Sequence, residues 1–455
     1  MNKIYNNILE AIGNTPIVRL NKVTQSVESQ IYAKCEFMNP GGSVKDRIGL
    51  AMIDDAEKKG LIKPGGTIVE CTSGNTGVGL AIAAAIKGYK CVFVMPDKMS
   101  NEKIRGLRAF GAKVVITPTA VEPEDPRSYY SVARRIAAET PNALHLNQYD
   151  NLSNRSAHYA MTGPEIWGQT EGKFDAFVAG LGTCGTITGT AMFLKEKNPK
   201  ISIVGVDPIG SLLYEYFKTG KKGPAHVYKI EGIGEDFVPK NLDVKVIDDI
   251  IQVNDKEAFQ MTRKLAVTEG IFCGVSSGAA VCGALRWASQ QKDPKKVIVL
   301  LPDSGSRYLS KVFDDDWMRE NGFLEEIYGS VRDLVNSLQK SQNLVTATKN
   351  STIEEVIQLM ADKGISQIPV TDKKEVIGLV SEGNLLNLLF NGKIQKKDSV
   401  SSVAEKNFVI VKLDDDLEKA MQSLSNNIVP LVTDKSDLIG IITKIDVLNY
   451  LGKHR

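Results

Sequence analysis

Apolar and polar positions follow two different patterns along this chain. Up to about residue 325, short apolar runs alternate with longer segments of helical periodicity; the runs cover residues 67–70, 90–95, 175–179 and 296–301. Continuous apolar runs of this length are typical of parallel strands that helices cover on both faces. The pattern therefore predicts an α/β fold, in which ligands bind at the carboxyl ends of the strands.

The segment from Ser43 to Lys59 is amphipathic with helical spacing and directly follows Gly41-Gly42. This arrangement places Lys45 at the start of a predicted helix, behind a glycine-rich turn. An amine held there is well placed to form a Schiff base with an aldehyde cofactor. The same residues also fit an ordinary surface helix that Ser43 caps, in which Lys45 is solvated.

Three loops rich in glycine and hydroxyl residues each lead into a helix-like run, and the first two also follow a strand-like run. They cover residues 72–77, 180–186 and 273–278. A turn that opens a helix leaves backbone N–H groups free to bind an anion. The first loop suits a carboxylate and the second a phosphate. Each loop alone is a weak signal, because glycine turns after strands are common in α/β proteins.

Taken together and in this order, these motifs resemble those of the fold-type II pyridoxal-phosphate enzymes, and specifically of the cystathionine β-synthase family. The resemblance begins at Gly13-Asn14-Thr15-Pro16 and continues to the C-terminus; it includes residues 33–37, 148–149, 204–208, 231–237 and 301–304. It implies a two-lobed, tryptophan synthase β-like α/β domain over residues 1–328 that binds pyridoxal 5′-phosphate.

The resemblance implies a β-replacement in which L-serine and L-homocysteine give cystathionine. Lys45 would be the catalytic residue, as Schiff-base lysine and base. The residues implied for the cofactor are Lys45, Asn75, Gly182, Thr183, Cys184, Gly185, Thr186 and Ser276. Those implied for the substrates are Thr72, Ser73, Thr76, Gln148, Tyr149 and Gly232.

Ser276 is expected to face the pyridine nitrogen of the cofactor, and Asn75 its 3′-oxygen. A hydroxyl stabilises a pyridinium less well than a carboxylate does, so the ring would stay near neutral. Elimination of the β-substituent is then favoured over transamination. The alternative for Ser276 is a helix N-cap.

Two residues depart from the family pattern. Cys184 stands where the phosphate loop usually has glycine, and its β-carbon restricts the backbone. It is either a tolerated small residue or a thiol whose pKa is lowered by a helix N-terminus. Glu235 stands where animal relatives have an aromatic residue. Its carboxylate either pairs with the homocysteine ammonium or is a solvated loop charge.

The last part of the chain contains an internal duplication. The stretch around Gly378 matches the stretch around Gly440, and each follows a Thr-Asp-Lys sequence. We expect a module over residues 329–455 with repeats at about 340–392 and 400–455. It resembles a tandem pair of CBS regulatory repeats, which implies S-adenosylmethionine or an adenine nucleotide as ligand.

In the second repeat, Thr443 and Asp446 match the family's ribose-binding pattern. In the first repeat Asn384 takes the acidic position, which predicts a weaker or empty site. The alternative is that the two repeats only pack together or dimerise.

Composition limits the partners and the compartment. The net charge of +2 and the absence of a basic arm predict no nucleic-acid partner. No apolar run spans a bilayer and no signal-peptide core is present, so we expect no membrane association and a cytoplasmic enzyme. The family resemblance implies a homodimer or a higher homo-oligomer.

The six cysteines include no C-x-x-C pair and the four histidines show no ligand spacing, which predicts reduced cysteines and no structural metal. Heme-containing relatives bind heme through an extension before the Gly-Asn-Thr-Pro segment. The residues before Gly13 include neither cysteine nor histidine, so no heme is expected.

Two other functions remain open. An O-acetylserine sulfhydrylase makes cysteine from O-acetylserine and sulfide with the same lysine, asparagine and phosphate loops; related enzymes also release sulfide from cysteine. The loop at 231–237 and the C-terminal repeats favour the synthase. The second alternative, a nucleotide sensor with an inactive catalytic domain, is disfavoured because every chemically required residue is present.

Overall fold

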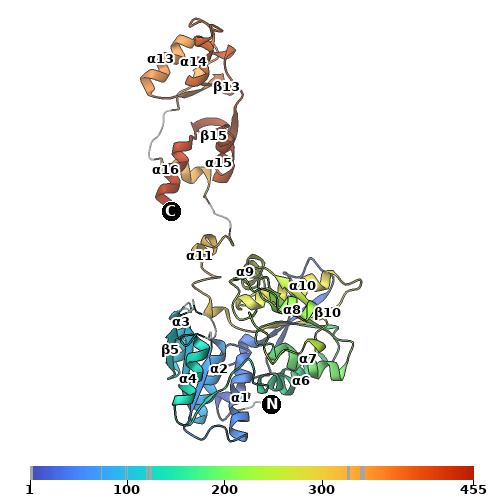
Figure 1. Ribbon diagram of the computed structural model, residues 1–455. Coiled ribbons are helices and arrows are strands. Elements are labelled where there is room, and N and C mark those ends of the chain that lie inside the picture. Colours follow the sequence, from blue (N-terminus) through green and yellow to red (C-terminus); the bar gives the residue numbers. More distant parts are fainter. Residues whose placement is uncertain are drawn as a thin grey trace. The chain divides into compact units, whose positions relative to one another are not determined.

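The chain divides into two compact units, Met1–Glu325 and Glu326–Arg455. A computed structural model describes residues 4–72, 74–97, 99, 101–118, 121, 125–324, 328–338 and 344–454. Figure 1 shows mixed helices and strands in both units. The predicted α/β class is confirmed. Within the described residues, no helix is both long and apolar enough to cross a membrane.

The larger sheet of the first unit has six strands. In spatial order they are β1 (Ile17–Arg19), β2 (Gln30–Cys35), β10 (Lys296–Leu301), β7 (Ala176–Gly180), β8 (Ser202–Pro208) and β9 (Asp249–Val253). All neighbours are parallel except β1 and β2. Along β10, Val299 packs into one hydrophobic core while Ile298 packs into another. Because both faces are buried, the strand reads as a continuous apolar run.

The smaller sheet of the first unit is fully parallel and has four strands. Their order is β5 (Lys113–Thr117), β4 (Lys90–Pro96), β3 (Thr67–Cys71) and β6 (Ala143–His145). Every residue of β3 is buried. Ile68 belongs to the core on one face, while Val69 and Cys71 belong to the core on the other.

Helices follow the strands as the sequence pattern predicts. Those of the first unit are α1 (Lys45–Lys58), α2 (Asn75–Lys87), α3 (Asn101–Ala109), α4 (Tyr129–Glu139), α5 (Ser153–Ala157), α6 (Gly163–Thr170), α7 (Gly185–Lys197), α8 (Leu213–Thr219), α9 (Asp255–Lys264), α10 (Val275–Ser289) and α11 (Asp315–Glu320). Its shorter elements are η1 (Ile8–Ala11), η2 (Glu36–Met38), η3 (His158–Thr162), η4 (Val244–Val246), η5 (Leu265–Glu269) and η6 (Gly305–Arg307).

Helices α1 and α2 touch through their backbones. A β-carbon added at Gly49 would lie 2.3 Å from the carbonyl carbon of Gly79, and one added at Gly79 would lie 2.4 Å from the carbonyl oxygen of Lys45. Only glycine permits so close an approach. The contact holds the backbone of Lys45 against the helix that follows the loop at 72–77.

The second unit contains two sheets of the same design. The first is β11 (Ala347–Thr348), β12 (Gln367–Asp372) and β13 (Glu375–Ser381); the second is β14 (Phe408–Lys412), β15 (Val429–Asp434) and β16 (Asp437–Ile441). Each has a parallel pair followed by an antiparallel pair. Gly378 pairs with Val370 as Gly440 pairs with Val432, and each register shifts one residue later. The duplication is therefore structural as well as sequential.

The helical elements of this unit are α12 (Val331–Ser337), α13 (Ile353–Lys363), α14 (Glu382–Phe390), η7 (Val400–Ser402), α15 (Leu417–Ser425) and α16 (Lys444–His454). Helix α12 comes before the first repeat in the chain but packs into the core of the second, with Val331 and Leu334 beside Val411 and Leu417.

Candidate functional site

Lys45 lies at the first position of α1, behind the Gly41-Gly42 turn. Its side chain is part-buried, and among the described residues no protein group accepts a hydrogen bond from its Nζ. Burial lowers the pKa of Lys45, although Asp303, Glu235 and Cys184 oppose that shift. The interpretation of Lys45 as a solvated surface lysine is therefore wrong, and its amine is biased toward the neutral, nucleophilic form.

The loop at residues 72–77 is held together by its own hydroxyl groups. Thr72 Oγ1 accepts hydrogen bonds from the backbone N–H of Gly74 (3.1 Å) and of Gly77 (3.3 Å). Thr76 Oγ1 donates to Gln148 Oε1 at 2.5 Å. The structure thus brings Thr72, Thr76 and Gln148 together, as the sequence predicts. Ser73 lies outside the described residues.

The loop at residues 180–186 connects β7 to α7. A β-carbon added at Gly185 would lie 2.0 Å from Asn154 Oδ1, so the backbone passes directly over that amide. Asn154 Nδ2 donates to Thr183 Oγ1 (3.1 Å) and to the Gln148 carbonyl (2.8 Å). Asn154 therefore joins this loop to Gln148, whose side chain contacts the loop at 72–77, called the substrate loop below. Asn154 was not among the predicted site residues, because a lone asparagine on a helix carries no motif.

Cys184 has a left-handed backbone with φ of 62°, a region that glycine adopts without strain. Its thiol donates to the Gly182 carbonyl at 3.1 Å and is almost completely buried. Burial raises the pKa of Cys184 well above its usual value, and Glu235 and Asp207 raise it further. The alternative of a thiol with a lowered pKa is wrong, since burial and the two carboxylates favour the neutral thiol.

Ser276 is the second residue of α10, and its side chain is buried. The N-cap of that helix is Gly274, so the N-cap interpretation of Ser276 is wrong. A β-carbon added at Gly232 would lie 3.8 Å from Ser276 Oγ. The loop at Gly232 therefore lies next to the hydroxyl, and glycine is favoured there by its φ of 88°.

Asn75, the first residue of α2, is held by groups from the end of β10. Asn75 Nδ2 donates to Asp303 Oδ2 at 2.8 Å, and Arg307 Nη1 donates to Asn75 Oδ1. Tyr308 Oη also donates to Asp303 Oδ2, at 2.6 Å, while Asp303 Oδ1 is buried and has no partner among the described residues. Asp303 and Arg307 were not among the predicted site residues, although Asp303 lies two residues after the buried strand β10.

Glu235 lies beside an aromatic cluster. Tyr149 contacts Phe237 with ring centroids 5.0 Å apart, and Tyr130 contacts the same ring at 6.4 Å. Burial raises the pKa of Glu235 well above its usual value, and Asp236 and Asp207 raise it further; Lys45 and a hydrogen bond from Tyr149 oppose the shift. Glu235 is thus not a solvated loop charge.

Glu231 joins its loop to α3 and to the segment after η6. It forms an ion pair with Lys103 of α3, and its other oxygen forms one with Lys311 at 2.6 Å. Although burial favours the neutral acid, the two lysines lower the pKa of Glu231. The residue is therefore an anchor for the loop at 231–237, which it holds across the candidate site.

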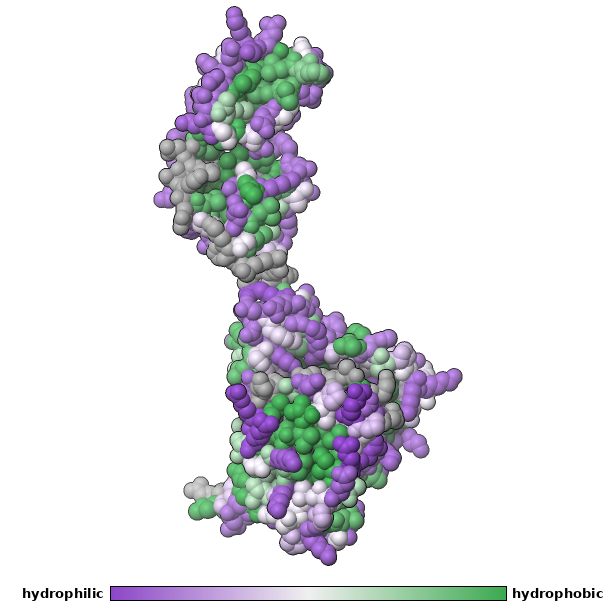
Figure 2. Space-filling model, turned by 60° about the vertical axis from the view of Figure 1, so that its left-hand side comes forward, coloured by the Kyte–Doolittle hydropathy of each residue, from purple (hydrophilic) through white to green (hydrophobic). Residues whose placement is uncertain are grey.

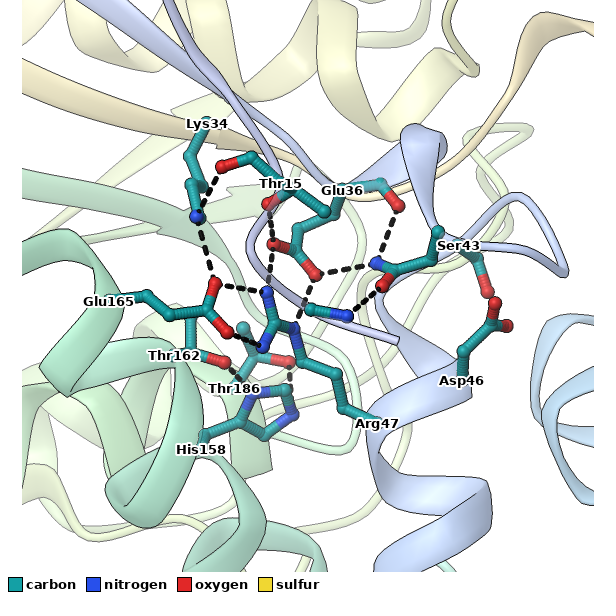
Figure 3. Close-up of polar contacts among 12 residues, drawn as sticks. Thr15, Lys34, Glu36, Ser43, Asp46, Arg47, His158, Thr162, Glu165 and Thr186 are labelled. Carbon is teal, nitrogen blue, oxygen red and sulfur yellow. Dashed lines mark hydrogen bonds and ion pairs between the residues drawn. The ribbon is translucent and has the colours of Figure 1, made fainter. Parts of the chain in front are cut away.

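Behind the site, α1 contributes to a buried network of charges (Figure 3). Arg47 donates to both oxygens of Glu36 (2.7 and 2.8 Å) and to both oxygens of Glu165 (2.7 Å each). Lys34 Nζ donates to Glu165 at 3.0 Å. His158 accompanies this network and contacts Thr186 Oγ1 of the phosphate loop at 3.2 Å.

In the second unit, Thr443 and Asp446 lie together at the start of α16. Thr443 Oγ1 donates to Asp446 Oδ2 at 2.5 Å, and the Thr443 backbone N–H donates to the same oxygen at 2.9 Å. The pair thus caps its helix. In the first repeat, Asn384 Nδ2 instead donates to the Val403 carbonyl at 3.4 Å.

Comparisons with known proteins agree with this arrangement. Residues 8–303 match the pyridoxal-phosphate dependent enzyme family, and residues 331–391 and 400–453 match the CBS domain. The cystathionine beta-synthase of Oryctolagus cuniculus is 43% identical over 99% of this chain and 85% of its own length. That of Saccharomyces cerevisiae is 37% identical over 98% of each.

Two solved structures are similar to the first unit. O-ureido-L-serine synthase is 39% identical, with a TM-score of 0.63, over 70% of this chain and 100% of its own. A hydrogen sulfide-producing enzyme from Fusobacterium nucleatum is 38% identical, with a TM-score of 0.62, over 68% of this chain and 99% of its own. The chain thus belongs to the pyridoxal-phosphate-dependent enzymes and, within them, to the cystathionine beta-synthase family with two C-terminal CBS domains.

Proposed function

We propose that the first unit, residues 1–328 in the boundaries expected from sequence, joins L-serine to L-homocysteine and gives L-cystathionine and water. The observation that carries this proposal is the near-complete alignment with cystathionine beta-synthases, which covers 98% and 99% of this chain in two relatives and includes both CBS domains. The relative from Saccharomyces cerevisiae is matched over 98% of its own length.

The described residues fit pyridoxal phosphate. Lys45 offers an amine without a protein partner, which suits a bond to the cofactor aldehyde. The first turn of α7 offers backbone N–H groups that have no partner within the helix, and Thr183 and Thr186 add hydroxyls for the phosphate. Asn75 and Ser276 supply polar groups for the ring. When bound, the cofactor withdraws electrons from the Cα of the amino-acid substrate.

The protein's own groups would position the substrate and move its protons. Thr72, Thr76 and Gln148 hold the loop whose backbone N–H groups bind the substrate carboxylate. Because its pKa is lowered, Lys45 Nζ can accept the proton from Cα and deliver it to the departing β-hydroxyl. The thiol of homocysteine would then give its proton to the Lys45 amine as its sulfur bonds to Cβ, and Lys45 would return that proton to Cα, which completes cystathionine. Tyr149 and Gly232 line the side from which the second substrate enters.

We assign Glu235 to the second substrate. Its carboxylate would pair with the homocysteine ammonium beside Tyr149 and Phe237. The position supports this role because Glu235 is close enough to Lys45 and Tyr149 for each to affect its pKa. Lys45 and Tyr149 only partly offset the burial of this carboxylate, so a cationic substrate group would stabilise its ionised form.

The deciding experiment identifies products by mass spectrometry. The cofactor-loaded protein is given L-serine with L-homocysteine, and separately O-acetylserine with sulfide or cysteine alone. Cystathionine from the first pair supports the proposal. Cysteine from the second pair alone would make the chain a sulfhydrylase. Sulfide from cysteine would support a second candidate function, the release of sulfide from cysteine. The similarity to the hydrogen sulfide-producing enzyme favours that candidate.

For the second unit we propose regulation by S-adenosylmethionine or an adenine nucleotide at Thr443 and Asp446. A hydroxyl and a carboxylate at a helix start suit a ribose diol, although the ligand must displace or share the hydrogen bond between them. Calorimetric titration of Asp446→Ala should show lost binding, with Asn384→Ala as the matched control in the first repeat. Equal binding by wild type and Asp446→Ala would contradict this site.

We also propose a homo-oligomer. Exposed apolar side chains recur on α14, where Leu386 is 70% and Phe390 86% exposed, and on α16, where Leu448 is 64% exposed. Figure 2 shows hydrophobic residues gathered into patches on the visible face of the protein. Light scattering compares the molar mass of Phe390→Ser with that of the wild type. An unchanged mass would contradict a contact through α14.

A further inference from the structure

Glu70, Cys71 and His145 form a cluster outside the site described above. They lie at the adjoining ends of β3 and β6, with one potential ligand atom from each residue within 4.8 Å of the others. Cys71 Sγ is 3.7 Å from Glu70 Oε1 and 3.8 Å from His145 Nε2, while Glu70 Oε1 is 3.7 Å from His145 Nε2. The three atoms therefore form a nearly equilateral triangle.

The His145–Glu70 separation is too long for a strong hydrogen bond between nitrogen and oxygen, and the two contacts of the Cys71 thiol are weak sulfur hydrogen bonds. The three separations agree with the spacing of ligands around one small cation. A point equidistant from the three atoms lies about 2.2 Å from each, which is within the range of zinc bonds to sulfur, imidazole nitrogen and carboxylate oxygen.

A second observation points to a cation. Glu70 is fully buried, and its other carboxylate oxygen, Oε2, has no hydrogen-bond partner among the described residues. A buried carboxylate with neither a hydrogen bond nor a counterion on one oxygen is costly. The Arg134 guanidinium, which affects the Cys71 thiol electrostatically, donates to Ser131 Oγ at 3.3 Å.

We propose that Glu70, Cys71 and His145 bind a thiophilic divalent cation, with zinc as the best match. A thiolate, an imidazole and a carboxylate together suit zinc better than magnesium or calcium, which prefer oxygen ligands alone. Binding releases the Cys71 thiol proton to solvent and forms the sulfur–metal bond. A water molecule can complete the tetrahedron from the side of His145, whose side chain is 17% exposed.

The position gives the cation a consequence for the substrate loop. Cys71 directly precedes Thr72, and its carbonyl oxygen accepts a hydrogen bond from Gln148 Nε2 at 3.2 Å. His145 is the last residue of β6 and lies three residues before Gln148 in the sequence. A metal bound here would link the ends of β3 and β6. It would thereby hold the two segments that lead to Thr72 and to Gln148.

This inference departs from the expectation of no structural metal, which rested on ligand spacing along the chain. Glu70 and Cys71 are adjacent, but His145 comes from a different strand. The parallel pairing of Val69 with His145 brings it alongside.

The test measures zinc binding to the full-length holoenzyme by competition with a chromophoric chelator, and zinc content by mass spectrometry. The variants are Cys71→Ala and His145→Gln. Cys91→Ala is the matched control, since Cys91 is a buried cysteine of the neighbouring strand β4 and lies outside the cluster. Cofactor absorbance and the melting temperature establish that each variant is folded.

We expect one tight zinc per wild-type chain, retained in Cys91→Ala and weakened by roughly a hundredfold or more in both cluster variants. Zinc should raise the melting temperature of the wild type and of Cys91→Ala only. Cobalt should give a thiolate charge-transfer band that Cys71→Ala lacks. The same zinc affinity in wild type and His145→Gln, or no zinc binding by the wild type, would overturn the proposal. If Cys71→Ala does not fold, the zinc affinity of His145→Gln alone tests the proposal. This variant is suitable because the His145 side chain is partly exposed.

Discussion

Helix α1 carries two basic residues near its start whose surroundings differ. Arg47 is completely buried, and Glu36 and Glu165 accept hydrogen bonds from three of its nitrogens (Figure 3). Burial alone would lower the pKa of Arg47, but the two carboxylates raise it above its usual range. Lys45, half a turn earlier, has no hydrogen bond from Nζ to a described protein group, and burial lowers its pKa.

Arg47 thus carries a structural charge, whereas Lys45 carries a reactive amine. Pairing offsets the large desolvation cost of a buried charge, so removal of one partner is strongly destabilising. A buried amine without a partner is destabilising in its charged form, which makes the neutral amine available for chemistry. The same helix therefore stabilises the unit through one residue and supplies its chemistry through another.

The largest expected effect comes from removing the reactive member. Lys45→Ala should lower the rate of cystathionine formation roughly a thousandfold or more, because both the cofactor bond and the base are lost. The melting temperature of the cofactor-free protein should not fall, since no hydrogen bond to a described group is broken. Lys59→Ala, at the exposed end of the helix, is the control and should keep full activity. Substantial residual activity in Lys45→Ala would contradict the assignment.

Replacing Arg47, the structural residue, should lower stability. Arg47→Met leaves Glu36 and Glu165 buried without their main partner, which should lower the free energy of unfolding of the first unit by about 3–5 kcal/mol. Urea unfolding measures the loss. Arg127→Met, which breaks an exposed pair with Asp125, should leave the free energy of unfolding nearly unchanged. An equal loss of unfolding free energy in Arg47→Met and Arg127→Met would contradict a structural role for the Arg47 charge.

Glu235→Gln tests whether the second substrate needs a carboxylate. Since the pKa of Glu235 is raised, the wild-type side chain is neutral at low pH and ionises as the pH increases through that raised value. The KM for homocysteine should therefore fall with increasing pH in the wild type. In Glu235→Gln it should be about tenfold higher above that pKa, with this pH dependence absent.

The KM for serine serves as the internal control in that experiment and should change little. A KM for homocysteine that is the same in both proteins across the pH range would leave Glu235 without a role in binding.

The smallest effect concerns Cys184. Cys184→Gly should retain activity and cofactor affinity, because φ of 62° is a conformation that glycine adopts freely. Stability should change by no more than about 1 kcal/mol, as relief of backbone strain offsets the loss of a buried sulfur. Cys184→Ser, which keeps the β-carbon, is the control. A large loss of activity in the glycine variant alone would mean that the thiol has a role.

The sequence predicted the strands and helices well, because residues buried on both faces of a sheet leave continuous apolar runs. The run at 296–301 coincides with β10, and the run at 90–95 is one residue short of β4. The loops at 72–77 and 180–186 were found because glycine and hydroxyl residues before a helix are a local signal. Asn154, Asp303 and Arg307 were missed, since their contacts come from distant parts of the chain.

By itself, the sequence determined the α/β class, the duplication in the last part of the chain and the identity of the lysine behind the glycine turn. Only the tertiary structure decided that Lys45 has no partner and Arg47 is fully paired, because pairing depends on which carboxylates the fold brings within reach. It also decided that burial raises the pKa of Cys184. Local spacing encodes elements, whereas desolvation and charge pairing are properties of the packed chain.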